Sequence, residues 1–257
     1  LFDRDQSGVT ITDAGQRIVE KAEALLASAN DFDHLVRLTS QRQEGRICFG
    51  MTPVVMQALV PNVIPSRLRE SPNFLFEAMA RDPEQLWQLL TARDIEFFVS
   101  QEWNVPDVLP VRVDLLGEFP IGLAVRPDHP LLKAPASAEQ FPVLLPAFGN
   151  KQGRLPFPLR YALPGAVHLF EDTTALSRLV QASDAIWMIA SYAILPELEK
   201  GELALLPWPD GDDAPSFRVA IYSLARRSLS PTALELKGVF QKQIRTLDDQ
   251  SAAWNTL

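Results

Sequence analysis

The stretch RICFGMTPVVMQALVPNVIPSRLRES, residues 46–71, decides the fold because it contains a complete step from a strand into a helix. Its first six residues, 46–51, are mostly apolar and include isoleucine and phenylalanine, which favour β-structure. Thr52 is a suitable N-cap and Pro53 suits the first helical position, so a helix is predicted directly after the strand. Pro61 is expected to break this helix into two pieces, because proline in a helix interior removes a backbone hydrogen bond.

The same alternation continues along the chain. Strands are predicted over 73–80 and 94–100, with a helix over 83–92 between them. Alternating strands and helices are typical of a parallel sheet built from right-handed crossovers. A second unit follows. It begins with a strand that ends in a turn (119–132) and continues with strands at 142–148, 166–172 and 185–190 and helices at 174–182 and 191–201. Two further strands, 202–209 and 217–225, and a closing helix at 230–247 complete it. The sequence therefore predicts an α/β fold with two subdomains, subdomain I (45–117 and 219–257) and subdomain II (118–218).

A ligand site is predicted between these subdomains, because ligands of open α/β sheets bind beyond the carboxyl ends of the strands. Thr52 offers a hydroxyl there, and the helix behind it offers free backbone N–H groups and a positive dipole end. This arrangement suits a carboxylate or another polar acceptor. For Arg81, a surface ion pair with Asp82 is an equal alternative to ligand contact. The predicted ligand-binding residues are Thr52, Pro53, Val54, Arg81, Ser100, Gln101, Phe148, Gly149, Thr173 and Ile189.

The residues from Thr12 to about Arg42 predict one long helix, which a polar turn, RDQSG (4–8), precedes. Apolar side chains recur in steps of four and three, which is the heptad pattern of a coiled-coil seam. The seam consists of Ile18, Ala22, Leu25, Ala29, Phe32 and Val36. Such a helix either lies on its own domain or pairs with a second copy of itself. The small alanines allow close approach of two helices, which favours pairing.

Composition excludes several classes of function. The net charge of −8 has the wrong sign for a protein that grips nucleic acid through general phosphate contacts. Cys48 is the only cysteine, so no intramolecular disulfide or cysteine-cluster metal site can form. The longest apolar run, 185–196, is too short to span a bilayer. We therefore expect a cytoplasmic protein without a membrane partner.

No catalytic constellation is visible in the sequence. His34, His129 and His168 are scattered, and none has metal-ligand spacing to another histidine or to the cysteine. No glycine-rich phosphate loop follows a strand, and the GxSxG pattern of a nucleophile elbow is absent. We therefore expect no catalytic residues, no metal and no cofactor, and a binding site rather than a reaction site.

Residues 1–26, LFDRDQSGVTITDAGQRIVEKAEALL, resemble the wing and linker-helix start of the LysR-type bacterial transcriptional regulators, whose pattern is LF-x-R-x-x-x-G-V-x-L-T-x-A-G. Ile11 stands for the usual leucine. The matching residues are Leu1, Phe2, Arg4, Gly8, Val9, Thr12, Ala14 and Gly15. Five later segments also resemble sequence motifs of the family: GRICFGM (45–51), LLTARDIEFFVS (89–100), VRPDHPLL (125–132), LEKGELALLPWP (198–209) and SLSPTALELKGVFQ (228–241). The resemblance thus covers the whole chain.

This resemblance implies a DNA-binding transcriptional regulator that senses a small molecule. Residues 1–11 would be the wing remnant of a winged helix-turn-helix whose other helices are missing before Leu1, with Arg4, Ser7 and Gly8 near the DNA. Residues 12–44 would be the linker and dimerisation helix, and 45–257 a periplasmic-binding-protein-like effector domain. The implied partners are promoter DNA for the full-length protein, an anionic or aromatic effector, and further copies of the chain in a homodimer or homotetramer. No cofactor is implied.

The sequence also departs from the family pattern. V-x-A-G-x-G-I falls on VQASDAI (180–186), so Ser183 and Ala185 replace two glycines. Arg93 stands at the glycine of L-x-x-G-x-L-D. The backbone conformation of both turns, and the shape of the site wall beside them, is therefore left open.

Two other classes of protein remain as alternatives. A solute-binding protein with the same two-lobed fold is the first, although it needs neither a heptad helix nor a wing-like start. A two-lobed enzyme of deaminase-like architecture is the second, and the missing catalytic groups disfavour it. On the regulator interpretation, this chain by itself is expected to show no sequence-specific binding to duplex DNA.

Overall fold

The computed structural model describes residues 2–5, 8–40, 45–102, 106, 110–135, 137–147, 155, 158–209 and 214–255 of the chain. It divides into two compact units. Leu1–Arg46 and Asn73–Leu75 form the first unit, and Ile47–Pro72 and Phe76–Leu257 form the second.

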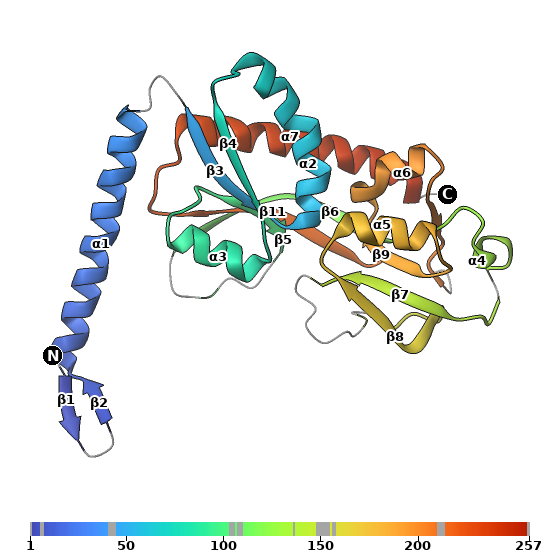
Figure 1. Ribbon diagram of the computed structural model, residues 1–257, viewed down its shortest axis with the longest axis horizontal. Coiled ribbons are helices and arrows are strands. Elements are labelled where there is room, and N and C mark those ends of the chain that lie inside the picture. Colours follow the sequence, from blue (N-terminus) through green and yellow to red (C-terminus); the bar gives the residue numbers. More distant parts are fainter. Residues whose placement is uncertain are drawn as a thin grey trace. The chain divides into compact units, whose positions relative to one another are not determined.

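The first unit contains a β-hairpin and a long helix (Figure 1). Strands β1 (Phe2–Asp5) and β2 (Gly8–Ile11) pair in antiparallel register, with Arg4 opposite Val9. The predicted long helix is confirmed as α1 (Asp13–Ser40). The Thr12 hydroxyl oxygen accepts a hydrogen bond from the Gly15 N–H at 3.0 Å, so Thr12 caps this helix as its residue type predicts. Ser7 and residues 41–44 lie outside the described residues.

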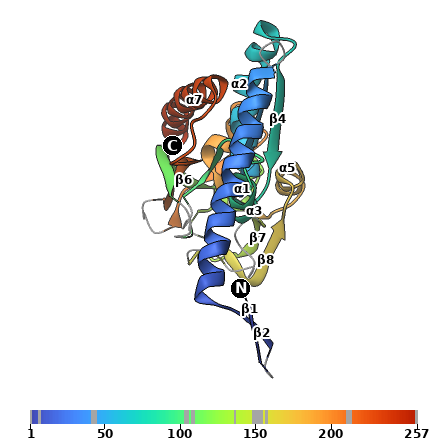
Figure 2. The same cartoon turned by 90° about the vertical axis from the view of Figure 1, so that its left-hand side faces the viewer.

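The second unit is built on one mixed sheet, whose described strands run in the order β4-β3-β5-β11-β6-β9-β7-β8, with β10 beside β6. We call the part of this unit at the β4 end of the sheet the first lobe. Its elements are β3 (Arg46–Met51), α2 (Pro53–Glu70), β4 (Leu75–Ala80), α3 (Pro83–Thr91), β5 (Phe98–Gln101) and α7 (Pro231–Asn255). Helix α7, which Figure 2 shows nearly end-on, packs against α2. Helix α3 contacts β5 and β11.

The second lobe lies at the other end of the sheet. Its elements are α4 (Pro130–Lys133), β7 (Phe141–Pro146), β8 (Ala162–Phe170), α5 (Thr173–Gln181), β9 (Ile186–Ala190), the 3₁₀ turn η1 (Ser191–Ile194), α6 (Leu195–Glu199) and β10 (Ala204–Leu206). The predicted parallel pairing is confirmed for β3 with β5 and for β7 with both β8 and β9. The carboxyl ends of each lobe's parallel strands therefore share one sheet edge.

Two long strands join the lobes. Strand β6 (Val111–Val125) pairs with β11 (Ser216–Leu224) in the first lobe and with β9 and β10 in the second. All of these pairings are antiparallel, and the β6–β11 ladder has a register shift between Val219 and Ala220. The predicted strand at 119–132 covered only the second half of β6. The first half of β6 alternates apolar and polar residues. It forms a strand because β11 pairs with β6 from Val111 to Pro120.

The expected break at Pro61 is wrong, since α2 continues through both Pro61 and Pro65. Both prolines are exposed, so the carbonyl groups that they leave unpaired face the side of the helix that water can reach. The opposite face buries Val55, Leu59 and Val63 in the core. Packing of that face holds the helix together across the prolines, because tertiary contacts supply most of the stability of protein helices.

Candidate ligand-binding site

Thr52 connects β3 to α2 and is only 2% exposed. Its backbone is fully used, because its N–H donates to the Val99 carbonyl at 3.1 Å and its carbonyl accepts from the Met56 N–H at 2.9 Å. The side chain is different. Its Oγ1 atom is buried without a hydrogen-bond partner and makes no capping bond to α2. The prediction that this hydroxyl caps the helix is therefore wrong, although Thr52 is the N-cap residue by position, and its side chain carries a buried polar atom without a partner.

The start of α2 is open to an acceptor. The first N–H groups of a helix have no carbonyl group one turn earlier to bond to. Pro53, at the first helical position, has no N–H, so the unpaired groups of α2 are those of Val54 and Val55. The Thr52 side chain does not cap them, and the first turn contains no acidic residue. The helix dipole adds partial positive charge at the same place. This end of α2 can therefore bind a carboxylate or a similar oxygen-rich group.

In the second lobe, the N-terminus of helix α5 is already capped by a carboxylate. Asp172 is the N-cap of α5, and its Oδ1 atom accepts hydrogen bonds from the Thr174 N–H at 2.7 Å and the Ala175 N–H at 3.1 Å. Thr173, a predicted ligand-binding residue, lies buried beside it as the first residue of α5. A carboxylate therefore closes this helix terminus, in contrast to the open terminus of α2.

Ser100 reaches the same sheet edge as Thr52. Strands β3 and β5 pair through Met51 and Val99, and each of the two hydroxyl residues follows by one position. Ser100 is buried and its hydroxyl donates to the Gln101 carbonyl at 2.8 Å, which leaves its oxygen able to accept a further bond. Gln101 is half-buried and lies opposite Val219 of β11. The structure thus brings together Thr52 and Ser100 as the sequence predicted.

Other predicted residues are placed less directly. The Arg81 N–H donates to the Met51 carbonyl at 3.2 Å, so Arg81 lies at the shared edge, but its exposed guanidinium folds back onto the Ala80 carbonyl at 2.7 Å. Its neighbour Asp82 caps α3 by accepting from the Gln85 N–H at 2.8 Å. Ile189 is buried within β9 rather than at its end. Phe148 and Gly149 lie outside the described residues.

Sequence reasoning missed Tyr192. This residue of η1 is buried, and its hydroxyl has no hydrogen-bond partner. Its ring packs between Phe119 of β6, with centroids 4.6 Å apart, and Phe217 of β11, at 6.4 Å. Burial raises the pKa of the Tyr192 hydroxyl, so it stays protonated and remains a hydrogen-bond donor. Tyr192 is the second residue after the predicted strand 185–190, and this place near a strand end was the available signal.

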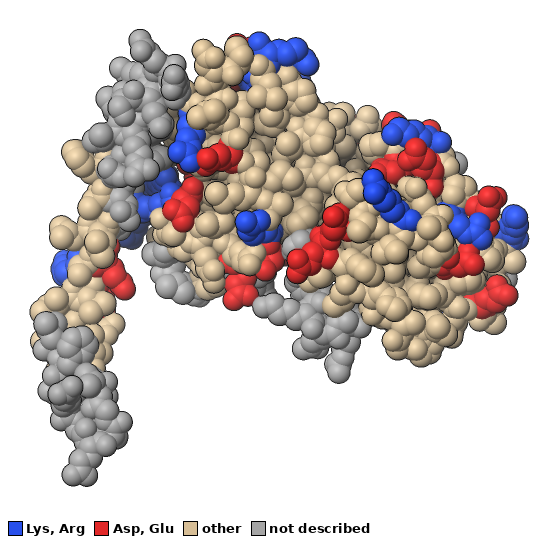
Figure 3. All heavy atoms as spheres, in the orientation of Figure 1, with Lys and Arg blue, Asp and Glu red and all other residues tan. Residues whose placement is uncertain are grey.

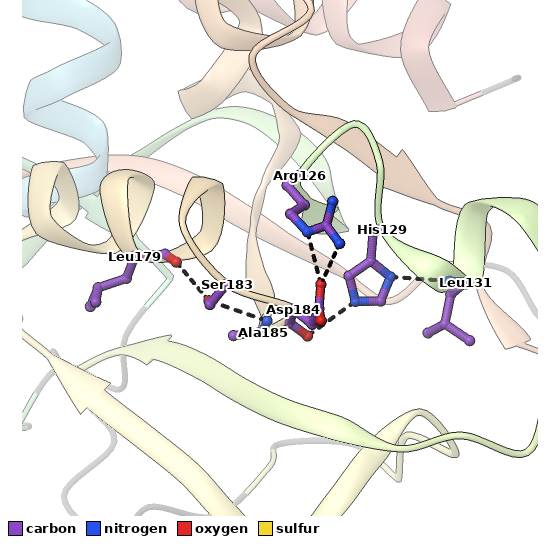
Figure 4. A network of polar contacts seen from close by, with 7 residues as sticks. All are labelled: Arg126, His129, Leu131, Leu179, Ser183, Asp184 and Ala185. Carbon is purple, nitrogen blue, oxygen red and sulfur yellow. Dashed lines mark hydrogen bonds and ion pairs between the residues drawn. The ribbon is translucent and has the colours of Figure 1, made fainter.

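A polar network fixes the turn before α4 (Figure 4). His129 is fully buried; its Nδ1 accepts from the Leu131 N–H at 3.2 Å, and its Nε2 lies 3.0 Å from the Asp184 carbonyl. The ring is therefore neutral with its proton on Nε2, and burial lowers the pKa of His129. The Arg126 guanidinium pairs with the Asp184 carboxylate at 2.8 Å. These contacts give His129 a structural role.

The two turns that lack the expected glycines are formed in different ways, one by an unusual backbone angle and the other by side-chain hydrogen bonds. Arg93 has φ of +67° and is the single non-glycine residue with positive φ in the described part of the chain. It thus holds the left-handed conformation that glycine would favour. Ser183 instead donates its hydroxyl proton to the Leu179 carbonyl at 2.6 Å and accepts from the Ala185 N–H at 3.3 Å (Figure 4).

The described surface shows neither a basic patch on the face drawn in Figure 3 nor a group of side chains that could hold a metal ion. On the face drawn in Figure 3, described basic and acidic side chains are interspersed, without a continuous basic patch. Within the described residues, no group of three or more histidine, cysteine, aspartate or glutamate side chains could hold a metal ion. None of the helices among these residues combines the length and apolar character that crossing a membrane requires.

The second unit has two α/β lobes on one sheet, and two strands cross between them. The start of α2 is open at the edge where β3 and β5 end. These features are typical of a two-lobed small-molecule-binding domain. Residues 40–245 match the family described as the LysR substrate binding domain, and the chain belongs to this family. The SDS degradation transcriptional activation protein of Pseudomonas sp. is 26% identical over 250 residues, which cover 93% of this chain and 80% of that protein. The HTH-type transcriptional regulator PcaQ of Agrobacterium fabrum is 22% identical over 247 residues, with 93% and 79% covered.

Solved structures show the same fold. A putative transcriptional regulator from Vibrio parahaemolyticus has a TM-score of 0.63 at 19% identity, and the match covers 81% of this chain and 99% of that one. A single-residue variant of full-length OxyR from Pseudomonas aeruginosa has a TM-score of 0.59 at 17% identity, with 95% and 79% covered. The chain is therefore a LysR-type transcriptional regulator with an effector-binding domain, as the resemblance in its sequence implied, and the solute-binding alternative is not favoured.

Proposed function

We propose that this regulator senses its effector at the start of α2. The observation that carries the proposal is the buried, unpartnered Thr52 hydroxyl beside the uncapped N–H groups of Val54 and Val55. Ser100 supplies a further hydroxyl at the same edge. A polar ligand group that binds there would supply hydrogen bonds that the free protein lacks.

Effector binding would favour one arrangement of the lobes. The α2 terminus belongs to the first lobe, and η1 of the second lobe packs against α2. A ligand that contacts both elements stabilises the lobe arrangement in which both sets of contacts form, by as much as its affinities for the two arrangements differ. No catalytic step is needed for this response. Since the relatives are transcriptional regulators, we infer that the chain binds its effector without converting it.

The proposal extends to pairing of two chains through α1. Ile18, Leu25 and Phe32 of the predicted seam are 54%, 73% and 69% exposed, which is unusual for large apolar side chains on one helix face. Ala22 and Ala29 are also exposed and would let a second helix approach closely. The side chain of Val36 lies outside the described residues. A homodimer built on this seam, with further contacts toward a homotetramer, would present paired DNA-binding elements to promoter DNA in the cytoplasm.

A ligand screen with a matched pair of variants tests the effector site. Thermal unfolding of the protein is measured with small organic acids and their neutral analogues, and each compound that raises the unfolding temperature is titrated by calorimetry. Thr52→Val should weaken binding of such a compound by about tenfold or more, since a hydrogen bond to a charged partner contributes roughly 1.5–3 kcal/mol. Thr246→Val, the same change at an exposed threonine of α7, should leave binding unchanged. Equal dissociation constants for Thr52→Val and the parent protein would remove Thr52 from the site.

A further inference from the structure

We propose that residues 111–115 of β6, which we call the edge segment, form an interaction surface that pairs with the edge segment of a second copy of the chain. The two segments would run antiparallel about a two-fold axis at Val113 and would join the first-lobe sheets of both copies. This surface is separate from the α1 seam, and the inference does not depend on the effector site.

In the first lobe, β6 is the last strand of the sheet and lies on the side away from β4 (Figure 2). Strand β11 pairs with β6 from Val111 to Pro120, whereas β9 and β10 pair with β6 only from Ile121 onward. No other described strand pairs with residues 111–120. Within the described part of the chain, the outer edge of the edge segment therefore has no neighbouring strand.

The direction of the backbone groups at this edge follows from the ladder on the other side. The Ala225 N–H donates to the Pro110 carbonyl at 2.9 Å, so these two residues form a hydrogen-bonded pair. Hydrogen-bonded and non-hydrogen-bonded pairs alternate along an antiparallel ladder. Val111, Val113 and Leu115 are therefore in non-hydrogen-bonded pairs with β11, and their N–H and C=O groups point away from it. A further strand can pair with this row of donors and acceptors.

A β-bulge marks the end of the edge segment. Leu115 pairs with Ala220 and Gly117 pairs with Val219, so Leu116 has no partner on β11. The extra residue shifts the alternation of inward and outward backbone groups. Regular pairing with a second strand is therefore limited to residues 111–115.

The sequence of the edge segment, VRVDL, is complementary to itself when two copies run antiparallel. When Val113 lies on the two-fold axis, Val111 faces Leu115 of the second copy. Arg112 then faces Asp114 of the second copy in a non-hydrogen-bonded pair, which brings opposite charges close together. One face of the paired strands would be apolar, and the other would carry two pairs of opposite charges. This match of charge and apolar positions favours a second copy over an unrelated strand.

The side chains of the edge segment are accessible for these contacts. Val113 and Leu115 are 50% and 57% exposed, and the Arg112 side chain is 68% exposed. One oxygen of Asp114 lies 3.2 Å from the Arg112 Nε atom, and the other bonds to Lys237 of α7. Burial acts to raise the pKa of Asp114, but the hydrogen bonds and charges of Lys237 and Arg112 together lower it. The carboxylate that would face Arg112 of the second copy is therefore ionised.

Sedimentation analysis of the whole chain tests the pairing, with Leu25→Asp and Phe32→Asp present so that the α1 seam does not contribute. This chain should show a monomer–dimer equilibrium across about 10–500 μM. Val113→Pro should raise its dissociation constant about tenfold or more, because both hydrogen bonds of the central pair are lost. The Val113 N–H points away from β11, so the proline removes no hydrogen bond from the folded chain.

Charge variants of the same chain provide a second test that does not alter the backbone. Arg112→Glu makes both charge pairs repulsive and should raise the dissociation constant about tenfold, whereas Arg112→Lys should change it by less than about threefold. Lys133→Glu alters the net charge equally at an exposed lysine of α4 and should leave it unchanged. Equal dissociation constants for Arg112→Glu and Lys133→Glu would overturn the proposal.

Cross-linking locates the contact. Val113→Cys, in a chain that also carries Cys48→Ser, places two thiols opposite each other on residues whose Cα atoms would be about 5.5 Å apart. A short bismaleimide reagent should join them into a covalent dimer, and Lys133→Cys should give none. Absence of the covalent dimer in the folded Val113→Cys chain would overturn the assignment. A chain that stays monomeric throughout the concentration range would also overturn it, and would leave the edge to a strand of another protein.

Discussion

Thr52→Val should change stability and ligand binding in opposite directions. In the ligand-free protein the Thr52 hydroxyl is buried and unpartnered, and it makes no cap to α2. A buried polar group without a partner costs about 1–3 kcal/mol, so its replacement by a methyl group should stabilise the free protein by about 1 kcal/mol or more. For a domain of this size, each kcal/mol raises the unfolding temperature by about 2–4 °C.

The assay is urea unfolding of the parent protein and of Thr52→Val, each without and with a saturating ligand. Without ligand, the variant's midpoint should rise at unchanged slope, because the surface exposed on unfolding stays the same. With ligand, the order should reverse, since the variant has lost a bond that only the complex forms. Thr246→Val reports the effect of the same chemical change at an exposed helical position. If the variant is instead less stable by about 1 kcal/mol without ligand, the hydroxyl is bonded in the free protein and this prediction is wrong.

Three further predictions concern other parts of the molecule. Leu25→Asp combined with Phe32→Asp places two charges in the α1 seam and should shift the protein to smaller species in sedimentation analysis; an unchanged mass would mean that the seam is not the interface. Arg93→Gly should stabilise the protein in thermal unfolding by up to about 1 kcal/mol, because the left-handed conformation costs a non-glycine residue roughly 1–2 kcal/mol. A less stable variant would show that the arginine side chain outweighs this cost. Burial lowers the pKa of His129, so the folded protein binds fewer protons than the unfolded chain, and stability should fall as pH drops below about 6.5, by at most about 1.4 kcal/mol per pH unit. His129→Gln should flatten this dependence in urea unfolding across that range, and an equally steep profile in the variant would assign the effect to another group.

The pattern of the sequence was enough to predict the two-lobed α/β fold and the neighbouring positions of Thr52 and Ser100. Alternating strands and helices gave the parallel pairs of both lobes, and the Thr52-Pro53 step located the start of α2. Thr52 and Ser100 then follow directly after a pair of parallel strands whose ends share one edge. These inferences depend on local chemistry and on topology, both of which the sequence carries.

What the sequence could not show depends on contacts between distant segments. Pro61 does not break α2, because packing of the opposite helix face outweighs a local breaker. Tyr192 is buried where Phe119 of β6 and Phe217 of β11 contact its ring, and these partners lie far from it in the sequence. The missing cap at Thr52 is likewise a matter of side-chain direction, which residue type alone does not determine.

The crossing strands have a consequence for how the lobes can move. Neither connection between the lobes is a free loop, since β6 and β11 hydrogen-bond to each other through the crossing. Large rotations would have to tear this ladder, so the accessible motion is a shallow twist of a two-stranded ribbon, centred where the register shifts at Val219 and Ala220. Such a two-stranded ribbon bends and twists only slightly while its hydrogen bonds stay intact. The lobes are therefore linked by a hydrogen-bonded pair of strands rather than by single unpaired segments, which restricts how far they can rotate.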